Sequence, residues 1–180
     1  HTHIRNNFNT IRIMHEHIYS KAQITWLIML RLFIGWHFMY EGMVKILNPK
    51  WTSLPYLLDS KGPLSSFFIQ MTQNDSLMVL VNYVNEYALL LVGLGLTLGC
   101  LFRLSAVGGM ILLAMYTLSH PSFVGASYMM PFEGSYLWID KNLVELAGLG
   151  LLCTFPTSHI IGFDRVVGRK FPILRKLKLI

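Results

Sequence analysis

Apolar residues in this chain are concentrated in four long blocks, which cover residues 24–47, 77–101, 104–119 and 136–155. A helix of about 20 residues crosses the hydrocarbon core of a bilayer. Each block is therefore predicted to form a transmembrane helix. The third and fourth blocks end at His120-Pro121 and Pro156, because proline does not continue a helix. The pattern predicts an all-α fold, an integral membrane four-helix bundle.

The loop between the first two helices, residues 48–76, is too apolar to be a plain linker. Its sequence predicts short helices over the outer end of the bundle, with Gly62-Pro63 as the break between two of them. We expect this loop to be ordered. Its aromatic residues are expected to pack over the bundle: Trp51, Tyr56, Phe67 and Phe68.

Lysine and arginine are distributed unequally between the two sides of the predicted membrane. Cytoplasmic segments carry an excess of these residues. One side has only Lys50 and Lys61, and the other has ten: Arg5, Arg12, Lys21, Arg103, Arg165, Arg169, Lys170, Arg175, Lys176 and Lys178. Both termini are therefore predicted to be cytoplasmic. Residues 1–22 are expected to be an amphipathic surface segment and residues 158–180 a basic tail.

The composition indicates a single membrane domain over residues 1–180. Of these residues 53% are hydrophobic and 13% are charged, whereas a soluble domain has about 25% charged residues. The net charge of +6 is carried by basic residues that flank apolar blocks. This placement favours the anionic headgroups of a lipid bilayer over nucleic acid. Cys100 and Cys153 stand alone in apolar surroundings, and we expect them neither to pair nor to do redox work.

Charged and polar side chains interrupt the predicted helices. Each charge at bilayer depth costs roughly 2.5–3.5 kcal/mol, so such residues normally face a protein interior. His37, Glu41 and Lys45 share one helix face at four-residue spacing. Lys141 and Glu145 repeat this spacing on the fourth helix. The candidates lie in the outer half: Glu41, Glu86, Glu145, His37, Tyr116 and His120 as pocket or proton-handling residues, and Lys45 and Lys141 as anion-binding residues.

This cluster of candidates has two interpretations. It can line an outward-facing pocket for a ligand or for protons, or it can be a salt-bridge network that locks the bundle. Three glutamates against two lysines leave one negative charge uncompensated, whereas a structural network would be expected to balance its own charge. The pocket is therefore favoured. Arg31 lies apart, in the inner half, where it is expected to reach the cytoplasmic headgroups.

The first predicted helix and the residues after it carry an arginine, two glycines, a lysine and a proline at fixed offsets: Arg31, Gly35, Gly42, Lys45 and Pro49. This pattern resembles the first-helix signature of the DoxX family of membrane proteins. Further segments resemble its DoxD-like branch, named for the small subunit of thiosulfate:quinone oxidoreductase. They are Trp51, residues 56–58, Gly62-Pro63, Asn85-Glu86, Gly93, and residues 96–103, 133–145 and 162–165.

The resemblance implies a multi-pass protein of the bacterial inner membrane that is associated with redox reactions. DoxD-like proteins are linked to thiosulfate oxidation coupled to quinone reduction, together with a second small subunit. Quinone is therefore the implied cofactor, and other membrane or periplasmic subunits are the implied partners. The chain has no flavin, iron–sulfur or haem motif and no metal-ligand pattern. Electrons are therefore expected to come from a partner or from the substrate.

Two functions follow as alternatives. The first is an oxidoreductase subunit whose outward-facing pocket binds a quinone headgroup or a small anion. Its glutamates would manage protons and its two lysines would attract the anion. The second is a non-catalytic structural or accessory subunit of a larger envelope or respiratory complex. The two differ in whether the polar cluster is functional or only structural.

Overall fold

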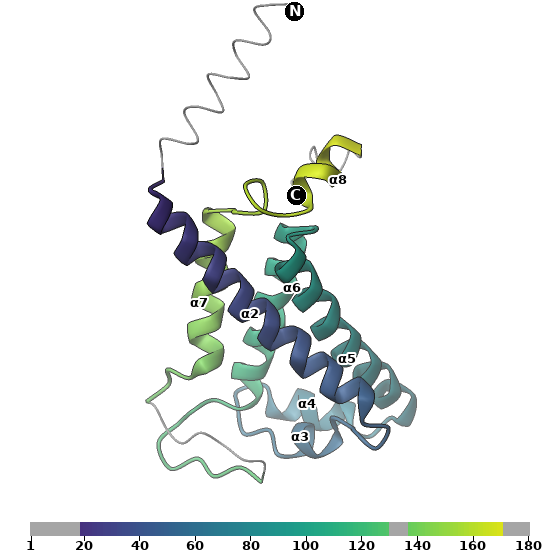
Figure 1. Ribbon diagram of the computed structural model, residues 1–180. Helices are drawn as coiled ribbons and strands as arrows, with labels where there is room; N and C mark the ends of the chain where they lie inside the picture. The colour runs from purple at the N-terminus through teal and green to yellow at the C-terminus, as the bar shows by residue number, and fades with distance from the viewer. Residues whose placement is uncertain (1–18, 130–136, 171–180) are drawn as a thin grey trace, which may run out of the picture.

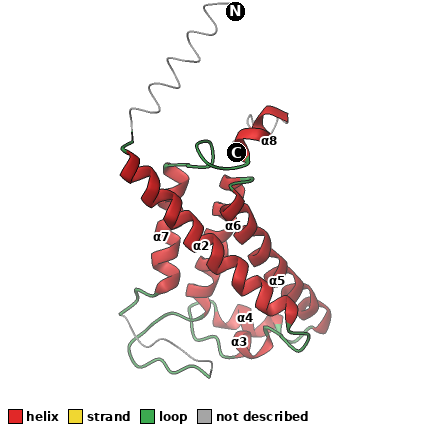
Figure 2. Cartoon of the chain, viewed as in Figure 1, coloured by secondary structure: helices red, strands yellow, loops and turns green. Residues whose placement is uncertain are grey.

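The computed structural model describes residues 19–129 and 137–170. In these residues every regular element is a helix, and there is no strand (Figure 2). Most of the expected amphipathic segment 1–22 and the last ten residues of the tail lie outside the described residues. The helices are α2 (Lys21–Leu47), α3 (Leu54–Leu58), α4 (Ser65–Met71), α5 (Asp75–Leu98), α6 (Phe102–Ser119), α7 (Lys141–Thr154) and α8 (Asp164–Lys170).

Within this part of the chain three helices are long and apolar enough to cross a membrane: α2, α5 and α6. Their ends agree with the first three predicted blocks to within three residues. The fourth block is wrong in length, because α7 has only 14 residues. Asp140 caps α7 by accepting a hydrogen bond from Leu143 N at 3.0 Å, so the helix begins at Lys141.

One apolar core joins the four longer helices. α2 packs along α5, and α6 packs against both α5 and α7 (Figure 1). The most buried core side chains come from all four helices, and they include Phe38, Leu96, Phe102, Leu149 and Leu152. α8 and the start of α2 lie at one end of the molecule, the α8 end, and α3 and α4 lie at the other, the cap end (Figure 1).

Two glycines bring α2 and α5 into direct backbone contact. A Cβ atom on Gly42 would lie 2.6 Å from Leu90 N, and one on Gly93 would overlap the backbone of Met39. Small residues at such a crossing allow the two backbones to approach closely. The rotation of α5 about its axis is therefore fixed against α2.

The cap consists of α3 and α4, which lie on either side of Gly62-Pro63 as predicted. Phe68 is only 4% exposed and packs with Leu57 and Met78. Phe67 is 49% exposed, so the expectation that it packs over the bundle is wrong. Gly62 is required at the break, because a Cβ there would overlap the carbonyl of Leu118.

Asp164 closes the α8 end of the molecule. Its carboxylate accepts hydrogen bonds from Leu101 N at 2.7 Å and Phe102 N at 3.1 Å. The first N–H groups of a helix lack intrahelical partners and attract negative charge. The first residue of α8 therefore caps the beginning of α6.

Arg31 is buried near Asp164, at the α8 end of the molecule, rather than among lipid headgroups. Its side chain is 2% exposed, and Nη1 donates a hydrogen bond to Thr157 Oγ1 at 3.2 Å. The nearby Asp164 carboxylate interacts with it electrostatically. The expectation that Arg31 reaches the lipid surface is therefore wrong. Its hydrogen-bond partner is Thr157, which lies 126 positions later in the chain.

Cys100 and Cys153 are free thiols. Cys100 lies two residues after the end of α5, and Cys153 lies in the last turn of α7. Burial raises the pKa of the Cys100 thiol, and Asp164 acts in the same direction. A raised pKa disfavours the thiolate, which is the reactive form of cysteine.

The contact between α2 and α5 makes a prediction about two helical glycines. Gly93→Ala should destabilise the protein by about 1–3 kcal/mol, because the added methyl group has no space. Gly150→Ala is the matched control, since a Cβ there meets nothing within 4 Å. Thermal unfolding in detergent measures both variants. Equal unfolding temperatures for Gly93→Ala and the wild type would contradict the close contact.

Candidate functional site

A cavity of about 470 Å³ lies among the four longer helices, next to the cap. This volume is in the usual range for small-molecule sites, which are mostly apolar with a few convergent polar groups. We call this cavity the pocket. It is lined by His37, Phe38, Glu41 and Lys45 of α2, Trp51, Thr52, Ser53 and Tyr56 at the cap, Asn85 and Leu89 of α5, Leu113 and Tyr116 of α6, and Lys141, Asn142 and Glu145 of α7.

Lys45 is held in the pocket by a chain of hydrogen bonds. Its Nζ donates to Asn85 Oδ1 at 3.0 Å, and Asn85 Nδ2 donates to the hydroxyl of Tyr116 at 2.7 Å. The same Nζ lies 5.0 Å from the ring centre of Trp51 and 5.8 Å from that of Tyr116, within range of a cation–π interaction. An ammonium group has three N–H donors. Asn85 accepts only one of them, so Lys45 can still bind an acceptor in the pocket.

His37 of α2 and Glu145 of α7 are in direct contact in the wall of the pocket. His37 Nδ1 lies 2.7 Å from Glu145 Oε1, and both side chains are mostly buried. The second carboxylate oxygen, Oε2, is buried and has no hydrogen-bond partner among the residues that the structure describes. A histidine paired with a carboxylate can gain or lose a proton near neutral pH. This pair is therefore the part of the pocket best suited to proton transfer.

The cap closes over the pocket through specific polar contacts. Asn82 Oδ1 accepts from Ser53 N at 2.9 Å and from Ser53 Oγ at 2.6 Å, which fixes the start of α3 to α5. Tyr56 of α3 meets Tyr116 edge to face, with ring centres 6.2 Å apart. Burial raises the pKa of Tyr56 well above its usual value, so its hydroxyl stays protonated.

Six of the eight sequence candidates line the pocket: His37, Glu41, Lys45, Tyr116, Lys141 and Glu145. Glu86 and His120 do not. Glu86 is half-buried on α5, and His120 lies at the end of α6, behind Tyr56. Without Glu86 the lining has two carboxylates and two ammonium groups, so the expected surplus negative charge is not found.

Sequence reasoning missed several lining residues as site candidates. Asn85 was visible as a polar residue inside an apolar block, and that position was the available signal. Trp51, Ser53 and Tyr56 lie in the loop that was expected to cover the bundle. No sequence pattern indicated that they also form one wall of the pocket.

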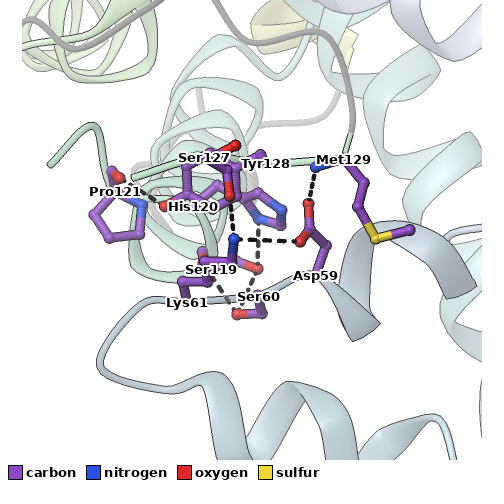
Figure 3. A network of polar contacts seen from close by, with 9 residues as sticks. All are labelled: Asp59, Ser60, Lys61, Ser119, His120, Pro121, Ser127, Tyr128 and Met129. Carbon is purple, nitrogen blue, oxygen red and sulfur yellow. Dashed lines mark hydrogen bonds and ion pairs between the residues drawn. The ribbon is translucent and has the colours of Figure 1, made fainter. Parts of the chain in front are cut away.

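A second polar cluster lies beside the pocket and ties the cap to the end of α6 (Figure 3). The backbone N–H groups of Lys61 and Gly62 donate to Ser119 O at 3.1 and 3.0 Å. Asp59 Oδ2 accepts from Met129 N at 2.5 Å, and Lys61 Nζ donates to the carbonyl of Ser127. We call this set of contacts the latch, because it joins residues 59–62, which connect the two helices of the cap, to residues 119–129.

Comparison with known proteins identifies one family. A family model described as DoxX matches residues 26–121, more than half of the chain. The match covers most of α2, the whole cap, α5 and α6. No curated protein and no solved structure matches the chain.

The chain of hydrogen bonds from Lys45 to Tyr116 predicts coupled effects on stability. Asn85→Leu should destabilise the protein by about 1–3 kcal/mol, because it leaves buried groups without partners. Tyr116→Phe removes one end of the same chain, so the double variant should lose less than the two single losses together. Thermal unfolding of the four proteins measures this coupling. Strictly additive losses would show that Asn85 does not join the two residues.

Proposed function

The chain belongs to the DoxX family, and we propose that it is a redox-associated membrane subunit whose pocket binds a quinone headgroup or a small anion. It is a multi-pass membrane protein, with α2, α5 and α6 as spans. We propose α7 as the fourth crossing, completing a four-helix bundle. Its length of about 21 Å is less than the hydrocarbon thickness of about 30 Å, so the residues before Lys141 would complete the crossing.

The observation that carries this proposal is a pocket with charged walls between membrane-spanning helices. Charged residues at membrane depth are expensive to place and usually mark a ligand or proton pathway. Here Glu41, Lys45 and Glu145 lie around one cavity. An apolar interior would hold the helices together without them. The charges therefore support a role in binding or proton transfer.

A quinone headgroup suits the chemistry of the lining. Trp51, Tyr56 and Tyr116 offer aromatic faces to a flat ring. Lys45 has N–H groups left for a carbonyl oxygen after its bond to Asn85. Reduction of a quinone to a quinol takes up two electrons and two protons. The His37–Glu145 pair can deliver protons to the pocket, and the electrons must come from a partner or a second substrate.

A small anion is the second ligand class. Lys45 and Lys141 both line the pocket, and protonation of His37 would give the lining a net positive charge. The DoxD-like resemblance links both ligand classes, because thiosulfate is an anion and quinone is the electron acceptor in that reaction. We therefore propose other membrane or periplasmic subunits as partners of the chain.

A structural or accessory role is the alternative function. The balanced charges of the lining favour it, since two carboxylates and two ammonium groups can compensate one another. The hydrogen bond from Lys45 to Asn85 also satisfies part of the network without a ligand. In this alternative the polar network that lines the pocket would hold the helices together within a larger complex.

The binding proposal predicts a specific effect of Lys45. The purified protein should bind a short-chain ubiquinone analogue, measured by quenching of tryptophan fluorescence. Lys45→Met should weaken this binding about tenfold or more, because it removes a charge-assisted hydrogen bond. Lys50→Met is the matched control, since Lys50 is exposed and outside the pocket. Equal affinities for the two variants would count against the pocket.

Two glutamates separate the functional and the structural alternatives. Glu145→Gln keeps the size of the side chain but removes its charge, so quinone bound during purification should fall. Glu86→Gln is the control, because Glu86 is on a spanning helix but does not line the pocket. Lipid extraction and mass spectrometry measure the bound quinone. If Glu145→Gln changes only thermal stability, the structural alternative holds.

We propose the bacterial inner membrane as the location, with both termini in the cytoplasm. The basis is the excess of lysine and arginine on one side of the spans. The start of α2 and α8 lie at the same end of the molecule, which fits this topology (Figure 1). A reporter enzyme that works only in the cytoplasm should therefore be active when it is fused after Ile180, and one that works only in the periplasm should be inactive. Periplasmic activity of the fusion would reverse the assignment.

A further inference from the structure

His120 lies in the latch between two tyrosine rings. Its ring is stacked on Tyr56 with the centres 3.8 Å apart and the planes at 22°. His120 also contacts Tyr128, and the centres of these two rings are 4.7 Å apart. His120 is only 7% exposed, although it directly follows the last residue of α6. Its environment is therefore formed by the cap on one side and the segment after α6 on the other.

The hydrogen bonds around His120 define where its proton lies. The hydroxyl of Ser60 donates to Ser119 O, and the hydroxyl of Ser119 donates to Ser60 Oγ, both at 3.0 Å. Each hydroxyl has one hydrogen to donate. His120 Nδ1, 3.0 Å from Ser119 Oγ, is therefore the donor in that contact. The other ring nitrogen, Nε2, is buried without a hydrogen-bond partner in the described part of the chain.

A proton on Nε2 would have no acceptor in the closed latch. Among the described residues, the charged and titratable groups that act on or contact His120 are Tyr56 of α3, Asp59 and Lys61 after it, and Tyr128. Tyr116 of α6 contacts Tyr56 instead. Asp59 favours the charged imidazole and Lys61 opposes it. Burial is the largest influence, and it lowers the pKa of His120. The closed latch therefore prefers the neutral ring.

The latch bears directly on the pocket. Tyr56 lines the pocket and stacks on His120 with the same ring. Three and four residues after the end of α3, the N–H groups of Lys61 and Gly62 donate to Ser119 O. A change that separates His120 from Tyr56 would therefore loosen a wall of the pocket together with the cap.

We propose that His120 makes the latch acid-sensitive: the neutral imidazole holds Tyr56 and the cap closed over the pocket, and protonation at Nε2 releases them. This inference rests on the proposed function in one respect, namely that the pocket holds a ligand and the cap retains it. On the outer side of the membrane, acidification would then open the site.

The direction of the pH effect follows from linkage. In the open cap His120 is solvated, with an ordinary pKa of about 6.5. The closed cap has a lower pKa, so it is fully favoured above about pH 6.5 and loses stability as the pH falls below that value. The loss ends once the pH passes below the pKa of the closed state. For each unit between the two pKa values, the ratio of open to closed cap rises up to about tenfold.

Hydrogen–deuterium exchange of the full-length protein in lipid nanodiscs tests the latch without any ligand. The amides of Lys61 and Gly62 report opening, because both donate to Ser119 O. We compare the wild type with His120→Asn, whose amide can keep the bond to Ser119 but cannot become charged. Comparison at equal pH removes the intrinsic pH dependence of exchange. From pH 7.5 to 5.5, the wild-type rate relative to the variant should rise several-fold, up to about tenfold per pKa unit.

His120→Phe is the second variant, because it keeps the stacked ring and cannot titrate, and the wild-type rate should rise in the same way relative to it. Amides in the middle of α5 are the internal reference, and their rate ratio between wild type and variant should be the same at both pH values. A rate ratio that stays constant with pH would overturn the proposal, as would a parallel rise in α5. Quinone binding is measured separately at pH 7.5. Its absence would remove the proposed function, while an acid-dependent rise at Lys61 and Gly62 would still establish the latch.

Discussion

The cost of charge in a hydrocarbon environment determines how the helices of this protein are oriented. α2 carries His37, Glu41 and Lys45 on one face, and α7 carries Lys141 and Glu145. If these faces met lipid, each charge would cost several kilocalories per mole. Turned inward, they cannot pack as densely as leucines, and a cavity of about 470 Å³ remains. The pocket is thus a consequence of turning charged faces inward between the helices, and residues at the cap line one of its walls.

Sequence reasoning predicted most of the fold because long apolar blocks and four-residue spacing are local properties. They gave the three spans, the break in the cap at Gly62, and the shared face of α2. The position of Glu86 could not be obtained in this way. α5 has polar residues on more than one face, and its rotation is set where Gly42 contacts the backbone of Glu86 and Leu90. That contact leaves Asn85 and Leu89, four residues apart, to face the pocket.

Pairings between distant segments were also beyond the sequence. Arg31 was expected at the lipid surface, but Thr157 and Asp164 meet it inside the protein. His120 was expected in the pocket, yet it stacks on Tyr56, and it is the Tyr56 side chain that lines the pocket. In both cases the deciding partner comes from a segment outside the four longer helices, whose position depends on the assembled helices. Apolar periodicity contains no information about such contacts.

α6 is fixed at both of its ends by residues from outside the helix. Asp164 binds the N–H groups at its beginning, and the cap binds the carbonyl of Ser119 at its end. The two attachments differ chemically. The carboxylate of Asp164 accepts two backbone donors with both oxygens, whereas the outer attachment includes an imidazole nitrogen with no partner. The attachment that includes His120 lies beside the pocket, because His120 stacks on the Tyr56 ring that lines it, whereas the carboxylate attachment holds the opposite end of α6.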